Sequence, residues 1–188
     1  MGPDALALMR GRQRLEVHRE ALERDPDSPA IGPPGASVTL VEFFDYRCPS
    51  CRELAPVLGA MVADDPDLRV VFKEWPVFKG VSITAARTAL AAGLQGRYWP
   101  LHERLMAMRG ITAARAREAA GELGCDLDRL DADLSAPPVE RHLALTARLA
   151  GELGFRGTPT LVLGRRVIPG ALDRRRLAAL VELARKDA

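Results

Sequence analysis

The order of apolar and polar positions predicts two buried strands separated by a helix in the first half of the chain. The stretches "VTLVEFF" (38–44) and "LRVVFKEW" (68–75) are short, nearly continuous apolar runs, which is typical of strands covered on both faces. Between them, from Pro49 to about Ala63, the apolar residues recur at a helical period. The first half of the chain therefore predicts a β-α-β unit.

The second half of the chain predicts a long helical block followed by a β-β-α unit. From Ser82 to about Gly154 the pattern is helical throughout, with breaks at glycines and at one Pro-Pro pair. The stretch "GTPTLVLGRRVIPGA" (157–171) predicts a strand, a tight turn and a second strand. The final "LDRRRLAALVELARKDA" predicts an amphipathic helix. This order predicts an α/β fold whose mixed sheet is interrupted by a helical insertion.

The beginning of the chain predicts a helix and a linker ahead of the sheet. Apolar residues between positions 5 and 24 form one helical stripe, and residues 25–37 are dense in proline and glycine. We therefore divide the chain into four parts. These are the N-terminal helix and linker (1–32), the first part of the α/β domain (33–80), the helical insertion (81–152) and the second part of the domain (153–188).

Composition and charge narrow the class of protein. The 188 residues are 47% hydrophobic and 28% charged, with a net charge of +2, as in an ordinary globular protein. Basic residues are mixed with acids and aromatic residues are few, so we expect no nucleic-acid partner. No apolar stretch approaches the roughly 20 residues of a membrane span, so we expect no membrane insertion. The apolar patch between Asp4 and Arg10 is too short for a secretory leader, which leaves a cytosolic protein or one whose leader was removed.

Two of the three cysteines, Cys48 and Cys51, form a CxxC motif where the first strand gives way to a helix. A structural zinc site would need four ligands, and Cys125 and the three histidines are not paired at ligand spacing. A structural disulfide between residues so close in sequence would constrain the unfolded chain little. We therefore interpret the motif as a redox-active pair that requires no metal and no organic cofactor.

The position of Cys48 favours thiol chemistry. Its sulfur would face the unpaired N–H groups and the positive dipole end of the helix, which favours the thiolate that attacks disulfides. Pro49 suits the first helical turn because its missing N–H costs nothing there. Ser50 carries no charge, so it should stabilise the thiolate less than a cationic residue would. Cys51, one turn further along, would be the more buried thiol that resolves a mixed disulfide.

Ionisable residues within the two apolar strands, and a proline near the end of the chain, are further candidates. Glu42 is either an exposed acid on an edge strand or a buried proton acceptor for Cys51 with a raised pKa. Lys73 either extends to the surface or reaches toward Glu42. Thr158 and Pro159 open the later hairpin, where a cis peptide bond can occur, although a proline at the start of a strand is usually trans.

Two residues of the helical block have simpler interpretations. Cys125 stands at an apolar position and is expected to be a buried structural thiol. His102 lies near Tyr98 and Trp99 and is expected to pack or hydrogen-bond within the insertion rather than to bind a metal.

These motifs together resemble the thioredoxin superfamily. The acid six residues before Cys48, the CxxC motif and the late "GTPT" occur in the order of that superfamily, and the helical block resembles that of DsbA-like thiol–disulfide oxidoreductases. The stretches "FFDYRCPSC", "VVFKEWP", "GRYWPLHERLM" and "ELGFRGTPTLVLG" are most similar to the ScsC-like branch. The resemblance implies a thioredoxin fold with a mixed central sheet and an all-helical insertion between the second strand and the cis-proline hairpin. By the same likeness we favour a contact of Lys73 with Glu42.

The resemblance also implies a role for each site residue. Cys48 would be the nucleophile that forms mixed disulfides, and Cys51 would resolve them. Pro159 would be the cis-proline, whose loop holds a substrate chain through backbone groups of Thr158. Glu42 would be the buried acid that tunes the cysteine pair.

The activity implied by the resemblance is protein thiol–disulfide exchange in the bacterial periplasm, as an isomerase or an oxidase. We favour an isomerase or general exchange role, because threonine before the cis-proline is more frequent in isomerase-like and reductase-like members than in strong oxidases. The implied partners are cysteine-containing client proteins and a membrane redox partner protein that resets the CxxC pair, and a homo-oligomer is compatible with the resemblance. An alternative hypothesis is a copper-tolerance protein in which Cys48 and Cys51 bind Cu(I), since soft thiolates suit that ion.

Overall fold

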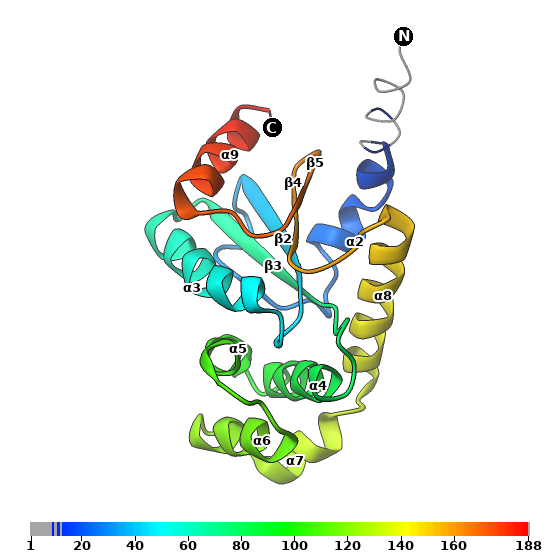
Figure 1. The fold of residues 1–188 in the computed structure, drawn as a ribbon, viewed down its shortest axis with the longest axis vertical. Coiled ribbons are helices and arrows are strands. Elements are labelled where there is room, and N and C mark those ends of the chain that lie inside the picture. Colours follow the sequence, from blue (N-terminus) through cyan, green and yellow to red (C-terminus); the bar gives the residue numbers. More distant parts are fainter. Residues whose placement is uncertain (1–8, 10, 12, 188) are drawn as a thin grey trace.

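A five-stranded mixed sheet forms the centre of the protein (Figure 1). The computed structural model describes residues 9, 11 and 13–187. Strands β2 and β3 run parallel and every other neighbouring pair is antiparallel, in the order β1-β3-β2-β4-β5. The mixed sheet expected from the sequence is therefore confirmed. The strands are β1 (Ala30–Ile31), β2 (Val38–Phe44), β3 (Leu68–Glu74), β4 (Thr160–Leu163) and β5 (Arg166–Pro169).

Helices cover both faces of the sheet and extend the molecule at one end (Figure 1). Helices α3 and α9 lie on one face, and α2 and α8 lie on the other. Helices α4 to α7 pack together beyond the end of β3, so the helical block expected between the second strand and the hairpin is confirmed. The helices are α2 (Arg19–Glu23), α3 (Pro49–Asp64), α4 (Val81–Gly93), α5 (Tyr98–Ala107), α6 (Ala113–Glu122), α7 (Leu127–Asp133), α8 (Pro137–Leu153) and α9 (Arg174–Lys186).

The alternation of side chains along β2 and β3 produces two apolar cores. Leu40, Phe44 and Phe72 belong to the core that α3 and α9 complete. Val41 and Phe43 belong to the core that α2 and α8 complete. Successive residues of a strand point to opposite faces, and both faces are covered here. For this reason both strands have nearly continuous apolar sequences.

We expected the proline- and glycine-rich segment 25–37 to be only a linker, but it also contains strand β1. The two residues of β1 pair antiparallel with β3 at the edge of the sheet. Gly32 follows directly with a φ of +86°, and a Cβ atom there would lie 2.2 Å from the carbonyl oxygen of Leu68. Only glycine fits at this crossing, since both the backbone conformation and the space exclude a side chain.

The helix expected over residues 5–24 is interrupted within its described part. Residues 5–8, 10 and 12 lie outside the described residues. From residue 13 to 17 the chain is helical, it turns at His18, and it continues as α2. Leu22 of α2 is buried in the core shared with α8, so this segment covers one face of the sheet.

The expected contact between Lys73 and Glu42 is wrong. Lys73 points to the opposite face of the sheet from Glu42. In the parallel register of β2 and β3, Lys73 pairs with the residue that follows Glu42. Its Nζ atom donates hydrogen bonds to the Ala21 carbonyl oxygen at 2.7 Å, to Ser28 Oγ at 2.7 Å and to an Asp25 carboxylate oxygen at 3.2 Å. Burial lowers the pKa of Lys73, and the negative charge of Asp25 partly offsets this effect. Lys73 therefore joins the sheet to the N-terminal segment.

Replacing Lys73 by methionine is expected to lower the free energy of unfolding by about 3 kcal/mol, because removing one partner of a buried ion pair leaves the other charge uncompensated. The Lys73 side chain is fully buried and that of Asp25 is 9% exposed. Urea denaturation followed by circular dichroism measures this loss. The double variant Lys73→Met/Asp25→Asn should recover part of the stability, whereas equal losses in the two variants would argue against charge pairing as the cause.

Candidate functional site

Cys48 lies at the junction of β2 and α3. It is the N-cap residue of α3, with extended backbone angles (φ −71°, ψ 119°), and Pro49 is the first helical residue. The Cys48 side chain is largely buried, at 5% exposure, and makes no capping hydrogen bond. Its sulfur thus lies at the helix end where unpaired N–H groups and the helix dipole favour negative charge.

The Thr158–Pro159 segment lies against Cys48. The peptide bond between Thr158 and Pro159 is cis. The Cys48 thiol donates a hydrogen bond to the Thr158 carbonyl oxygen, with Sγ and oxygen 3.1 Å apart. Because β4 begins directly after Pro159 and pairs with β2, the sheet brings together two segments that are 110 residues apart in sequence.

Cys51 and Glu42 form a buried pair of ionisable groups behind Cys48. Both side chains are 0% exposed. Burial raises the pKa of the Cys51 thiol, and the negative charge of Glu42 raises it further. Burial likewise raises the pKa of Glu42 to about 8, with smaller contributions from the charges of Cys48 and Glu74. Both groups are thus held in their protonated forms at neutral pH.

Glu42 occupies the central strand of the sheet, so its alternative interpretation as an exposed edge-strand acid is wrong. Strand β2 lies between β3 and β4. Within the described part of the chain, neither carboxylate oxygen of Glu42 has a hydrogen-bond partner. An unpaired carboxyl group in such a place is costly to folding, which is typical of functional sites.

The residues between and after the two cysteines differ in their contacts. Pro49 is exposed and Ser50 is half-buried on the first turn of α3. Arg52 donates to the carbonyl oxygens of Tyr46 at 3.4 Å and Met108 at 2.6 Å. Arg52 is therefore not simply solvated, and it ties α3 to the end of α5.

Asp45 is a site residue that the sequence analysis missed. Its carboxylate accepts hydrogen bonds from the Arg47 backbone N–H at 2.8 Å, the Phe78 backbone N–H at 3.0 Å and the Ser82 hydroxyl at 2.8 Å. It is 2% exposed. Asp45 thereby holds the turn before Cys48 against the loop between β3 and α4. An aspartate that bonds the N–H group two residues ahead is typical of turns, and this was the available signal.

A buried polar network begins two residues before Cys48. The Tyr46 hydroxyl lies 3.2 Å from His102 Nδ1, and the Tyr98 hydroxyl donates to Glu74 Oε1 at 2.5 Å. Burial lowers the pKa of His102 to about 4, so its ring is neutral at physiological pH. The ring stacks on Trp99. The expectation that His102 packs within the insertion is confirmed, and its nearest hydrogen-bond partner, Tyr46, lies outside the insertion.

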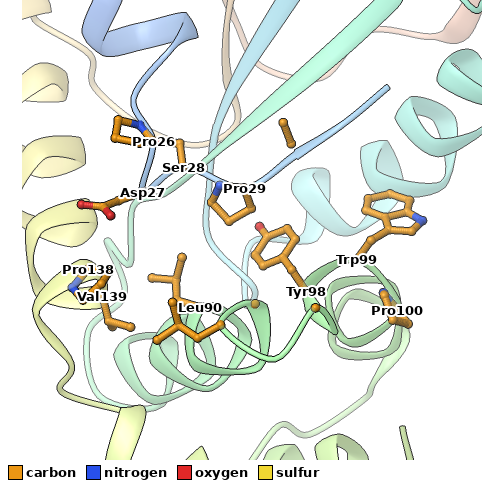
Figure 2. A pocket seen from close by; sticks show the side chains of 14 residues that line it. Pro26, Asp27, Ser28, Pro29, Leu90, Tyr98, Trp99, Pro100, Pro138 and Val139 are labelled. Atoms are coloured by element: carbon orange, nitrogen blue, oxygen red, sulfur yellow. The ribbon is translucent and has the colours of Figure 1, made fainter. Parts of the chain in front are cut away.

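The network continues through Glu74 and His142 to a cavity, whose lining residues Figure 2 shows. Glu74 Oε2 lies 2.6 Å from His142 Nε2, and His142 Nδ1 lies 3.1 Å from Ser28 Oγ. Ser28 and Tyr98 line a cavity of about 430 Å³ between segment 26–30 and helices α4, α5 and α8. Burial favours the neutral acid, but the charge and hydrogen bonds of His142 and Tyr98 outweigh it and lower the pKa of Glu74. No lining residue comes from the two segments that meet at the CxxC motif, so the cavity is separate from the thiol site.

Cys125 is apart from the thiol site. It is 8% exposed and packs in the same apolar core as the residues of α4 and α6. Burial raises the pKa of its thiol, which makes it a poor nucleophile. The interpretation of Cys125 as a buried structural thiol agrees with this placement.

The mixed sheet, the CxxC motif at the start of a helix and the cis-proline segment against it define a protein of the thioredoxin-like class. The chain belongs, more narrowly, to the DSBA-like thioredoxin domain family, whose sequence profile matches residues 39–182. The thioredoxin fold with a helical insertion, which the resemblance implied, is confirmed.

Similar solved structures include a thioredoxin-like oxidoreductase and a ScsC catalytic domain. A thioredoxin-like oxidoreductase from Silicibacter pomeroyi DSS-3 is 42% identical with a TM-score of 0.86, covering 90% of this chain and 99% of that one. The catalytic domain of Proteus mirabilis ScsC is 29% identical with a TM-score of 0.85, covering 93% of this chain and 98% of that one. The similarity to DsbA-like and ScsC-like proteins is thus confirmed.

The curated relatives are much longer than this chain. The Na(+)/H(+) antiporter NhaA 1 of Salinispora arenicola is 32% identical over 164 residues, which are 85% of this chain and 25% of the antiporter. The NhaA antiporter of Herminiimonas arsenicoxydans is 32% identical over 165 residues, which are 86% of this chain and 26% of that protein. The chain thus spans about a quarter of these relatives. Within the described residues, no helix has both the length and the apolar character needed to cross a membrane.

Proposed function

We propose that the protein catalyses thiol–disulfide exchange on cysteines of other proteins through Cys48 and Cys51. The observation that carries this proposal is the place of the Cys48 sulfur at the start of α3, 3.1 Å from the Thr158 carbonyl oxygen. A sulfur at a helix N-terminus has the environment of reactive cysteines. Backbone groups of Thr158 can pair with an extended client segment, and Pro159 fixes the direction of that segment.

The proposed exchange passes through a mixed disulfide. A client thiolate attacks the Cys48 sulfur of the oxidised protein, the client–Cys48 bond forms, and Cys51 leaves as a thiolate. A second client thiolate then attacks the client sulfur, so that Cys48 leaves as a thiolate and the client leaves as a disulfide. The client loses two electrons and the CxxC pair gains them. The reverse sequence reduces a client disulfide. If Cys48 attacks a client disulfide and another client thiolate then displaces Cys48, the client disulfide is rearranged instead.

Glu42 is the proposed proton carrier for Cys51. Its carboxyl group is protonated up to a pH of about 8, because burial raises its pKa to about 8. Because neither Glu42 oxygen has a hydrogen-bond partner among the described residues, we propose that Glu42 gives a proton to Cys51 through one bridging water when that sulfur leaves, and accepts it by the same route when Cys51 attacks. Pro49 and Ser50, the two residues between the cysteines, bring no charge to the pair.

The proposed setting is the periplasm, with a membrane redox partner that resets the CxxC pair. A periplasmic thioredoxin-like protein from Salmonella enterica serovar Typhimurium is 32% identical, with a TM-score of 0.78, and covers 90% of this chain and 97% of that one. This relative supports the setting. Among the possible directions of exchange we favour disulfide isomerisation, in line with threonine before the cis-proline.

Equilibration with glutathione buffers, followed by alkylation and mass analysis, tests the proposed function. We expect one two-electron transition of Cys48 and Cys51, unchanged in a Cys125→Ala variant. A reduction potential above about −150 mV would indicate an oxidase, since strongly oxidising proteins of this class have reduction potentials of about −120 mV. A protein in which Cys48 and Cys51 form no disulfide in any buffer would refute the proposal. Tight Cu(I) binding without disulfide exchange would favour the copper hypothesis instead.

A further inference from the structure

A basic and aromatic surface lies directly beside Cys48. The Arg47 guanidinium carbon lies 6.0 Å from the centre of the Phe78 ring, in the geometry of a cation–π contact. Phe78 is 52% exposed. Arg47 immediately precedes Cys48 in the chain, so this pair forms part of the rim of the thiol site. We call Arg47, Phe78 and Lys79 the basic rim.

The backbone of the basic rim is built with strain. Lys79 has a φ of +54°, the one positive φ of a non-glycine residue in the described part of the chain. Such a conformation costs free energy and is common at functional sites. The buried carboxylate of Asp45 holds this loop through the Phe78 N–H and the Ser82 hydroxyl, and it also holds the Arg47 N–H. Asp45 therefore fixes both parts of the rim relative to Cys48.

The exposed charged side chains on the loops beside Cys48 are basic. Three segments lie at or beside the thiol: residues 45–49 contain Cys48, residues 154–159 contain Thr158, which the thiol contacts, and residues 76–81 are bonded to Asp45. Their exposed charged side chains are Arg47, Lys79 and Arg156, and their one acid, Asp45, is buried. Glu53 is exposed on the second turn of α3. The three loop segments therefore present three exposed basic side chains beside the thiol, against one exposed acid on α3, although the whole chain carries a net charge of only +2.

We propose that the basic rim selects clients whose reactive cysteine is flanked by acidic side chains. A carboxylate next to the client cysteine would approach Arg47 or Lys79 as the client sulfur approaches Cys48, while a basic neighbour would be repelled. The contact with Phe78 limits the motion of the Arg47 side chain, so less entropy is lost when the ion pair forms. This inference rests on the proposed exchange function and adds the class of client.

The test uses competition among three peptides that differ only in the residues beside a single cysteine, namely glutamate, glutamine or lysine. Each peptide is supplied as its symmetrical disulfide to a reduced Cys51→Ala variant, in which the mixed disulfide with Cys48 persists. Cys48 attacks, one peptide stays bound and one leaves as a thiol, and mass analysis counts the adducts. We expect the ratio of glutamate-peptide adducts to lysine-peptide adducts to be about fivefold higher than in a variant without the two basic side chains. This is the effect expected from two exposed ion pairs.

The reference variant is Arg47→Gln/Lys79→Gln, in which the intrinsic reactivities of the peptides are unchanged and the preference should be lost. The matched control is Arg175→Gln/Lys186→Gln, two exposed residues of α9. The start of α9 bonds Asp64 at the far end of α3, about 24 Å along that helix from Cys48, so this control should keep the preference. Raising the sodium chloride concentration from about 20 mM to about 500 mM should reduce the preference for the glutamate peptide.

Each outcome separates the two proposals. Equal glutamate-to-lysine ratios in Cys51→Ala and in Cys51→Ala/Arg47→Gln/Lys79→Gln would overturn the basic rim as a selector and leave thiol exchange intact. A loss of preference in the α9 control as well would assign it to overall charge and also overturn the inference. Absence of every adduct in the Cys51→Ala variant would refute the exchange function itself.

Discussion

Replacing Cys48 by alanine is expected to reduce disulfide exchange by more than about 100-fold, because the attacking sulfur is removed and no other thiol can take its place. Cys51 is fully buried and Cys125 lies in the core of the helical block. Burial raises the pKa of both remaining thiols. The measurement is the rate at which a scrambled disulfide substrate regains its native pairing.

The Cys51→Ala variant should behave differently from Cys48→Ala. Its Cys48 thiol can still attack a client, but the mixed disulfide has no second thiol to resolve it, so adducts with clients accumulate. The Cys125→Ala variant serves as the control and should retain the parent rate. If Cys48→Ala kept most of its activity, or if adducts formed through Cys125, the assignment of the nucleophile would be wrong.

The strands and the position of the CxxC motif could be predicted from the sequence because their signals are local. Strands β2 and β3 are covered on both faces, so their apolar runs stand out, and α3 follows with a clear helical period. The isomer of the Thr158–Pro159 peptide bond, in contrast, could not be predicted from local sequence. Local sequence left it open, and only the resemblance to a family indicated the cis form that the structure has.

The features that were missed depend on register and on contacts distant in sequence. Two apolar strands do not reveal their pairing register, so the sequence could not show that Lys73 and Glu42 point to opposite faces. Strand β1 has two residues, too few for any period. Asp45 bonds Phe78 and Ser82, which are 33 and 37 residues away, and only the fold brings these groups together.

Glu42 connects the stability of the protein to pH, and its replacement by leucine should show this directly. Burial raises the pKa of Glu42 from 4.5 to about 8 in the folded protein. Below pH 4.5 the carboxyl group is protonated in both the folded and the unfolded states. Between pH 4.5 and about 8, unfolding releases its proton, so a rising pH favours the unfolded state. The folded protein therefore loses about 1.4 kcal/mol of stability per pH unit from this group.

The Glu42→Leu variant lacks this loss, so its advantage in free energy of unfolding should grow by about 3 kcal/mol from about pH 5 to about pH 7. Urea denaturation of the reduced proteins across this range measures the difference, which is insensitive to all ionisable groups that the two proteins share. Glu53→Leu, which removes an exposed carboxylate from α3, is the control and should show no such growth. The Glu42→Leu variant should also slow the release of client from Cys48, because Cys51 has lost its proton acceptor. A constant difference across the pH range would mean that Glu42 is already ionised in the folded protein, and its proposed role as proton carrier would fail with it.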